Sequence, residues 1–292
     1  MPGADQIAAA PISWGVCEVP GWGYQLPGAR VLAEMRQLGF TATEAGPDDF
    51  LPAEGRELAE TLEIAKLTLV GGFTPLVLHD PAGGWRSTLN AAIERFGAAG
   101  GNSVIIAADT GQSGYDTRSD LSADEWARLL AALDEATARC ADAGLRASLH
   151  PHVGTIVEGP DEVARVADGS RVAFCLDTGH ITAGGGDPVA LARDLPERIN
   201  HVHFKDVEAG LAARVAAGEV PYSDAVRAGV FRPLGDGDVD IPAIVAALRA
   251  VNYSGWYVLE QDVMLSAAPP EDAGPMLDVA RSKEYLASIL DS

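Results

Sequence analysis

The sequence contains few cysteines. Among its 292 residues there are only three, Cys17, Cys140 and Cys175. An odd number without a Cys-x-x-Cys spacing argues against a disulfide framework and against a zinc knuckle, and it is typical of a protein kept in a reducing compartment. We therefore expect the chain to be cytoplasmic.

Positive charge is also scarce. The chain has 21 Lys and Arg residues against 42 Asp and Glu residues, which gives a formal net charge of -21. A surface this acidic repels phosphate backbones and anionic lipids. We therefore expect neither a nucleic acid nor a membrane among its partners.

Long apolar runs are missing as well. No stretch reaches the roughly 20 residues that a membrane-spanning helix needs. The N-terminal segment 1–6 has neither the basic nor the apolar region of a signal peptide, which argues against secretion. Hydrophobic residues nevertheless make up 47% of the chain, enough for a large core.

A strand–loop–helix rhythm repeats along the sequence. Gly39, Gly100, Gly144 and Gly255 each stand between a helical pattern and a following strand pattern. Such alternation predicts a parallel sheet. The expected strands are 7–14, 42–45, 67–72, 103–108, 146–150, 171–176, 199–203 and 256–260. The expected helices are 28–38, 54–66, 86–99, 123–143, 160–167, 188–195 and 241–251.

Eight such units in one chain of this length predict a closed (β/α)8 TIM barrel that forms a single domain over residues 1–292. An open doubly wound sheet is the alternative, but no G-x-G-x-x-G follows the first strand. The connection 206–240 is unusually long and contains two helical patches, 208–217 and 223–228. Long loops of this kind commonly cover an active site. The tail is expected to be helical over 273–290.

Four of the expected strands end in residues that bind metals. Asp177 follows the sixth strand, His203 lies on the seventh and Glu260 ends the eighth. His150 ends the fifth strand and His152 follows it, so either imidazole can be the fourth ligand, and His150 is preferred because it belongs to the strand. The carboxyl ends of barrel strands meet at one face, so these four tips are expected to hold one divalent metal.

Each candidate also has a structural interpretation. Asp177 fits a helix N-cap or a salt bridge, and Glu260 fits an exposed carboxylate beyond a strand end. His201 points to the same side as His203 but one layer deeper, where it can hydrogen-bond a metal ligand. Two carboxylates and two imidazoles suit Mn²⁺ or Co²⁺, and also Fe²⁺. Mg²⁺ prefers more oxygen ligands, and a structural Zn²⁺ prefers four closed sites.

Three motifs resemble the xylose-isomerase-like barrels, the sugar isomerase and epimerase superfamily. They are DTGH at 177–180, HVHFKD at 201–206 and PLGDGDVD at 233–240. Three further segments resemble the myo-inosose-2 dehydratase branch of that superfamily: PISWG at 11–15, TEAGP at 43–47 and HPHVGT at 150–155. The resemblance runs from about residue 8 to 265 and specifies fold and metal better than substrate.

The resemblance implies a metal-dependent dehydratase (a hydro-lyase) of inositol catabolism, acting on 2-keto-myo-inositol through an enediolate that the metal stabilises. It places the ligands on His150, Asp177, His203 and Glu260, and it makes His180 a substrate-binding residue. Most members of the superfamily carry glutamate where this chain has His150. We expect this exchange to leave more positive charge on the metal.

Several residues are candidates for moving protons or binding substrate. Proton transfer is assigned to His152, His180, Lys205 or Glu158, although Lys205 can equally pair with a rim carboxylate. Substrate contacts are expected from Trp14, Glu44, His180 and Arg232. The alternatives are core packing for Trp14, helix capping for Glu44 and simple charge balance for Arg232.

Two other functions fit the same motifs. A keto-sugar isomerase or epimerase would share the metal and the first proton transfer, whereas a sugar-binding barrel without turnover would lack a metal. The chain has no glycine-rich phosphate cradle, so a neutral keto-polyol is favoured over a phosphosugar. A homo-oligomer that pairs through the long connection, over residues 208–232, is also expected.

Overall fold

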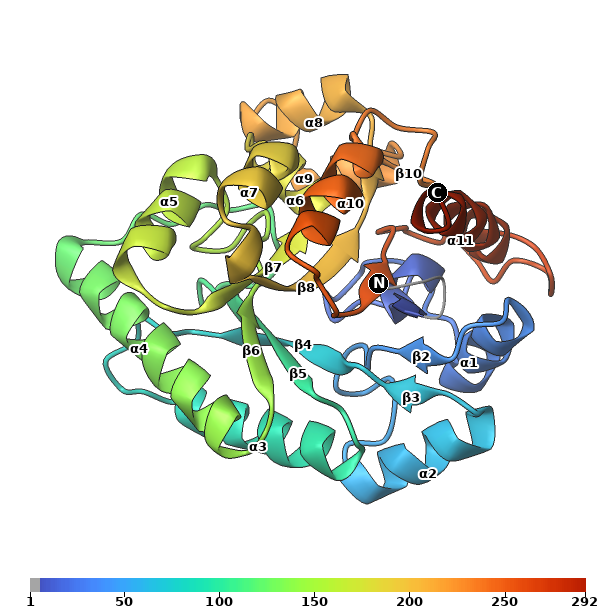
Figure 1. The fold of residues 1–292 in the computed structure, drawn as a ribbon, viewed down its shortest axis with the longest axis horizontal. Coiled ribbons are helices and arrows are strands. Elements are labelled where there is room, and N and C mark those ends of the chain that lie inside the picture. The colour runs from blue at the N-terminus through green and yellow to red at the C-terminus, as the bar shows by residue number, and fades with distance from the viewer. Residues whose placement is uncertain (1–5) are drawn as a thin grey trace.

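The fold is a parallel β-barrel surrounded by helices, as seen in a computed structural model that describes residues 6–292 (Figure 1). Residues 1–5, which carry most of the segment used above to argue against a signal peptide, lie outside the described part. Nine strands pair in the order β3-β2-β1-β11-β8-β7-β6-β5-β4, and every pairing in this sheet is parallel. These strands are β1 (Ile7–Ala9), β2 (Ala42–Thr43), β3 (Thr68–Leu69), β4 (Gly71–Leu76), β5 (Ser103–Ala108), β6 (Arg146–Leu149), β7 (Ala173–Asp177), β8 (Ile199–Phe204) and β11 (Tyr257–Leu259).

The third barrel strand closes the sheet. β3 pairs with β2 and β4 pairs with β5, yet only Val70 separates β3 from β4. Val70 itself joins both sides, because its N–H donates to Thr43 at 2.9 Å and its carbonyl accepts from Asn102 at 3.0 Å. The nine segments therefore occupy eight barrel positions, and the predicted (β/α)8 barrel is confirmed.

Two expected strand ends were wrong by more than two residues. The first strand ends at Ala9 rather than at residue 14, since Pro11 has no N–H to continue the ladder, and a 3-10 helix, η2 (Pro11–Trp14), follows. The third strand extends beyond residue 72 to Leu76, because β4 pairs with β5 along its whole length. Both changes lie near the end of the barrel that carries the candidate site.

Helices cover the outside of the barrel (Figure 1). The long α4 begins with a capping box in which Ser122 and Glu125 satisfy each other's backbone N–H groups. One apolar cluster, containing residues from Ile7 to Leu290, fills the space between helices and strands. The outer helices are α1 (Gly28–Gln37), α2 (Gly55–Ala65), α3 (Trp85–Ala98), α4 (Ala123–Asp142), α5 (Pro160–Gly169), α7 (Pro188–Asp194), α10 (Ile241–Ala250) and α11 (Pro275–Leu290), with a short η3 (Pro196–Arg198) before β8.

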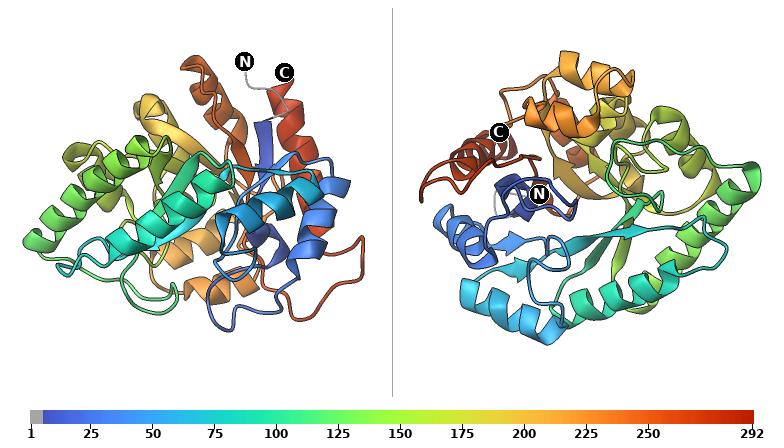
Figure 2. Two further views of the ribbon diagram at one scale, coloured as in Figure 1. Left: turned by 90° about the horizontal axis from the view of Figure 1, so that it is seen from below. Right: turned by 180° about the vertical axis from the view of Figure 1, so that it is seen from behind.

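The long connection after β8 folds over the carboxyl end of the barrel. It contains α8 (Ala209–Ala216), α9 (Tyr222–Arg227) and the antiparallel pair β9 (Asp206–Val207) and β10 (Phe231–Arg232). Figure 2 shows this segment at the end of the barrel opposite the C-terminus. Asp206 holds it in place, because its carboxylate accepts the N–H groups of Gly235, Gly237 and Val239 at 2.9 to 3.1 Å.

Between residues 6 and 292, no helix combines the length and the apolar character needed to cross a membrane.

Candidate active site

The four residues predicted to bind a metal come together at the carboxyl end of the barrel. His150 directly follows β6, and Asp177 ends β7. His203 lies on β8, and Glu260 directly follows β11. All four side chains are buried. Because neighbouring parallel strands end at the same face, residues 110 positions apart in sequence share one location.

The distances among these side chains fit one cation. Nε2 of His150 lies 3.1 Å from Oδ2 of Asp177. Nδ1 of His203 lies 3.5 Å from that same oxygen and 3.2 Å from Oε2 of Glu260. Ligands that bind one metal at ~2.1 Å and at right angles to each other lie ~3 Å apart. A divalent metal therefore fits among these four groups.

The donor set agrees with this geometry. Although Nδ1 of His203 lies close to two carboxylates, it makes no aligned hydrogen bond within residues 6–292. Burial lowers the pKa of His203, but nearby anionic groups such as Glu260 and Glu44 outweigh burial and hold that pKa well above its usual value. A bound cation would therefore take the place of a proton between Nδ1 and the two carboxylates. Burying two carboxylates without a cation is costly, so the pair also requires positive charge nearby.

Glu44 fixes the orientation of His203. Its Oε1 accepts a hydrogen bond from Nε2 of His203 at 3.0 Å, which leaves Nδ1 facing Asp177 and Glu260. Metal-binding histidines commonly donate their other ring N–H to a carboxylate in this way. Glu44 was expected to bind substrate. It lines the cavity, but one of its oxygens already serves this histidine.

His201 lies one layer deeper, as expected, and its partner is also Glu44. Nε2 of His201 donates to Oε1 of Glu44 at 2.7 Å. Burial raises the pKa of Glu44, but the charge of His203 and the hydrogen bonds from both imidazoles outweigh burial and hold that pKa well below its usual range. Glu44 is therefore an anion that faces two imidazoles.

Asp177 combines two of the roles considered for it. Its Oδ1 accepts the N–H of His180 at 2.7 Å and caps α6 (Thr178–Ala183), a short helix that the sequence patterns did not predict. Its Oδ2 faces the other candidate ligands. α6 packs closely against Lys205 because Gly179 has no side chain. A Cβ at this position would lie only 2.5 Å from Cβ of Lys205.

Lys205 brings a positive charge to the same oxygens. Its Nζ lies 3.0 Å from Oδ2 of Asp177, 2.8 Å from Oε2 of Glu260 and 3.0 Å from Oδ1 of Asp262. Burial lowers the pKa of Lys205, but the three carboxylates outweigh burial and hold that pKa well above its ordinary value. The side chain is therefore a buried ammonium that contacts two of the candidate metal ligands.

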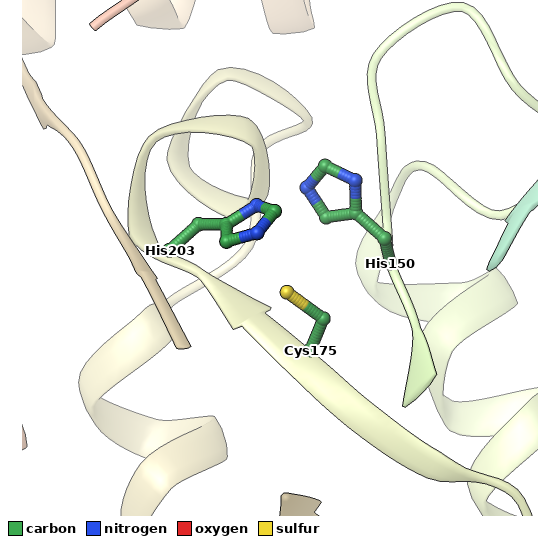
Figure 3. A group of neighbouring side chains, drawn as sticks. All are labelled: His150, Cys175 and His203. Carbon is green, nitrogen blue, oxygen red and sulfur yellow. The ribbon is translucent and has the colours of Figure 1, made fainter. Parts of the chain in front are cut away.

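Cys175 lies beneath the metal candidates. Figure 3 shows its sulfur directed toward the rings of His150 and His203. It occupies the same face of β7 as Asp177, two residues earlier, and it is fully buried. Burial raises the pKa of its thiol to about 11, so the sulfur is protonated and packs as a small apolar group.

A cavity of about 560 Å³ opens at this face of the barrel. His150, His203 and Glu260 line its inner end, together with Lys205 and Glu44. Deeply buried His201 and Cys175 do not reach it. Asp177 does not line the cavity either, so a substrate can approach the candidate ligands from the side of His150, His203 and Glu260.

His152 and His180 form a stacked pair beside the candidate ligands. Their ring centroids are 3.7 Å apart, with 30° between the planes. His152 lines the cavity, and its Nδ1 lies 2.7 Å from the carbonyl oxygen of Val153, which fixes the proton on Nδ1 and leaves Nε2 as an acceptor. Burial holds the pKa of His152 well below its usual value, so the ring is neutral. His180 lies behind it, with Nε2 3.5 Å from Asp262.

Three other candidates lie away from the inner cavity. Trp14 is fully buried in the core and donates its indole N–H to Glu34 at 2.8 Å, which agrees with the packing alternative. Glu158 pairs with Arg118 and accepts the N–H of Gly154 at 2.9 Å. Arg232 is exposed on β10 and lines a separate pocket at the outer side of the long connection.

Two residues of the site were missed. Asp262 is buried, contacts Lys205 and accepts a hydrogen bond from the hydroxyl of Tyr222. A signal for Asp262 was present, because it stands two residues after Glu260 and can point to the same side. Tyr222 lies on α9, where no periodic pattern connects it to the strand tips.

Replacing Glu44 by glutamine tests the role assigned to this residue. We expect metal affinity to fall by roughly 10- to 100-fold, since the partner that orients a metal-binding histidine is weakened. Metal titration of the purified variant measures this loss. Glu63→Gln, an exposed change of the same kind on α2, is the control. Equal metal affinities for the two variants would show that Glu44 does not orient His203.

Comparisons with known proteins agree with the fold. The family model of the xylose isomerase-like TIM barrel matches residues 32–283. Two solved structures align over nearly the whole chain. An L-ribulose 3-epimerase has a TM-score of 0.68 at 17% identity and covers 98% of this chain and 94% of its own. The IOLI protein with a bound zinc atom has a TM-score of 0.69 at 14% identity and covers 98% of both chains.

Relatives with greater sequence identity are also found. The rhizopine catabolism protein MocC of Rhizobium meliloti is 33% identical over 97% of this chain and 87% of its own length. The inosose dehydratase of Geobacillus kaustophilus (strain HTA426) is 30% identical over 96% of this chain and 93% of its own length. With a family model that covers most of its length and relatives aligned almost end to end, the chain belongs to the xylose isomerase-like TIM barrel family.

Proposed function

We propose that this chain is a metal-dependent hydro-lyase that removes water from a keto-polyol, with 2-keto-myo-inositol as the leading substrate. The observation that carries the proposal is the convergence of His150, Asp177, His203 and Glu260 at the carboxyl end of the barrel, where all of them except Asp177 line one cavity. Relatives named inosose dehydratase, aligned over 96% of the chain or more, support the substrate class.

The four converging side chains would hold the metal. Two carboxylates and two imidazoles favour Mn²⁺ or Co²⁺, with Fe²⁺, Mg²⁺ and Zn²⁺ as further candidates. When bound, a divalent metal polarises the ketone of the substrate and makes the neighbouring C–H more acidic. An imidazole binds a metal through an unprotonated ring nitrogen. Burial lowers the pKa of His150 to about 4, so its imidazole is neutral and can bind the metal.

His152 is the best placed general base. Its Nε2 is free to accept a proton, since Nδ1 is engaged with the carbonyl of Val153. The ring lines the cavity beside His150, with 5.3 Å between the two centroids. In the proposed reaction, Nε2 of His152 takes the proton from the carbon next to the ketone.

Lys205 is the best placed general acid. Its ammonium remains protonated between three carboxylates and lines the same cavity. In the proposed reaction, Nζ gives a proton to the β-hydroxyl, and the C–O bond breaks to release water. The electron pair of the broken C–H bond forms a C=C bond as the C–O bond breaks. One proton is taken from carbon and one is given to oxygen, so the reaction involves no net oxidation or reduction.

Tyr222 and Asp262 link the long segment after β8 to Lys205. The hydroxyl of Tyr222 donates to Asp262, which also lies 3.0 Å from Nζ of Lys205. α9 is thereby held over the cavity, where it limits the entry of water. This arrangement orients the ammonium that the proposed reaction uses as its acid.

The proposal is tested by turnover in the presence and absence of metal. The protein is stripped with a chelator, reconstituted with Mn²⁺ or Co²⁺, and mixed with 2-keto-myo-inositol. We expect an absorbing conjugated diketone to form only with the reconstituted protein. Metal-free protein that has been shown by circular dichroism to remain folded is the control.

The same experiment separates the dehydratase from the isomerase or epimerase alternative. Ketohexoses are offered in parallel, and changes in stereochemistry are followed by NMR. If ketohexoses are epimerised and no diketone forms, the protein is an isomerase or epimerase and the proposed dehydration is wrong. A protein that binds metal but turns over neither substrate class would contradict both.

A further inference from the structure

The cavity extends well beyond the candidate ligands. Its volume of about 560 Å³ lies within the roughly 300–1,000 Å³ of pockets that hold drug-sized ligands. A single polyol ring is smaller than such a ligand, so it would leave part of the cavity unfilled. The inner end is formed by the strand tips. The outer half is formed by the loop after η2, residues 15–27, and by the loop after Glu44, residues 45–50.

The outer half differs from the inner end in chemistry. Half-buried apolar side chains form its sides, and oxygen acceptors stand at its rim. The apolar residues are Ile12, Pro47, Phe50 and Pro75, and the acceptors are Glu18 and Asp49. No lysine or arginine other than Lys205 lines the cavity within residues 6–292.

The walls of the outer half are held in place by specific bonds. The indole N–H of Trp22 donates to the carbonyl of Val263 at 3.0 Å, and the N–H of Tyr24 donates to Leu265 at 2.7 Å. Across the mouth, the hydroxyl of Tyr115 donates to Glu18. These contacts join loops that are distant in sequence, so the walls of the outer half are fixed in position.

We propose that the outer half binds a sugar ring linked through oxygen to the keto-polyol, so that the substrate is a glycosylated ring. A sugar presents apolar C–H faces, which fit Phe50 and Pro47, and hydroxyl edges, which fit the acceptors at the rim. The acidic rim disfavours a phosphate or carboxylate substituent. This inference rests on the proposed function and specifies its substrate class.

The inference is tested by calorimetry on the metal-loaded protein with two non-reacting probes. Galactinol carries a galactosyl group on myo-inositol, whereas myo-inositol is the bare ring. We expect galactinol to bind at least about tenfold more tightly, a difference of about 1.4 kcal/mol. Phe50→Ala and Asp49→Ala alter only the outer half, so each should weaken galactinol and leave myo-inositol unchanged.

Failure of this inference is distinct from failure of the proposed function. Galactinol that binds no better than myo-inositol, including the case in which neither binds, overturns the glycosyl site. So does a preference that survives in both variants. The proposed function is tested separately by diketone formation from 2-keto-myo-inositol, which needs no occupant in the outer half.

Discussion

Glu260→Gln is expected to release the metal and to lower turnover of 2-keto-myo-inositol by about two to three orders of magnitude. The reason is that Oε2 of Glu260 lies 3.2 Å from Nδ1 of His203 and supplies one of two anionic ligands. Losing several kcal/mol of charge stabilisation in the transition state corresponds to a loss of this size. Metal content and steady-state turnover of the same preparation measure both effects.

The control for this variant is Glu271→Gln, which removes the same charge from an exposed position on the same loop. It should retain full metal content and full turnover. Glu260 is preferred over Asp177 for this experiment because Asp177 also caps α6. A Glu260→Gln protein that binds one equivalent of metal with unchanged affinity would remove Glu260 from the ligand set.

Lys205→Met is expected to separate turnover from metal binding. Turnover should fall by about 10²- to 10⁴-fold, the range for the loss of a general acid. Metal affinity should rise, because the ammonium no longer contacts Oδ2 of Asp177 and Oε2 of Glu260. Metal titration and turnover assays on one preparation measure the two quantities, and Lys66→Met, an exposed change, is the control.

The stability of the same variant provides an independent check. Without Lys205, the metal-free protein holds buried carboxylates that have lost their cation, which typically costs about 3–5 kcal/mol. Added metal should restore most of the lost thermal stability, since a ligand that binds only the folded state stabilises it. If metal affinity falls together with turnover, Lys205 holds the ligands in place and does not compete with the metal.

The sequence was sufficient to predict the barrel and the positions of its strand tips. Apolar runs that end in His150, Asp177 or Glu260 are visible without a structure, and barrel geometry brings such ends together. The expected strand over residues 7–14 failed at Pro11, because a local turn ended the ladder sooner than the apolar pattern indicated. Trp14 therefore packs in the core instead of ending a strand.

The partners of the strand tips were not predictable in the same way. Glu44 contacts His201 and His203 from positions 157 and 159 residues earlier in the chain, across the barrel interior. Only the packed barrel brings β2 and β8 to that distance. Tyr222 contacts Asp262 from a connection that has no strand periodicity, so its position depends on how Asp206 and the turn after β10 hold the segment.

The most direct test is a crystal structure of the Mn²⁺-loaded protein with anomalous diffraction. We expect one anomalous peak at about 2.0–2.3 Å from Nε2 of His150, Oδ2 of Asp177, Nδ1 of His203 and Oε2 of Glu260. A peak held instead by Glu44 and His201, or a fully metal-loaded protein with no peak among the four strand tips, would contradict the proposed metal centre.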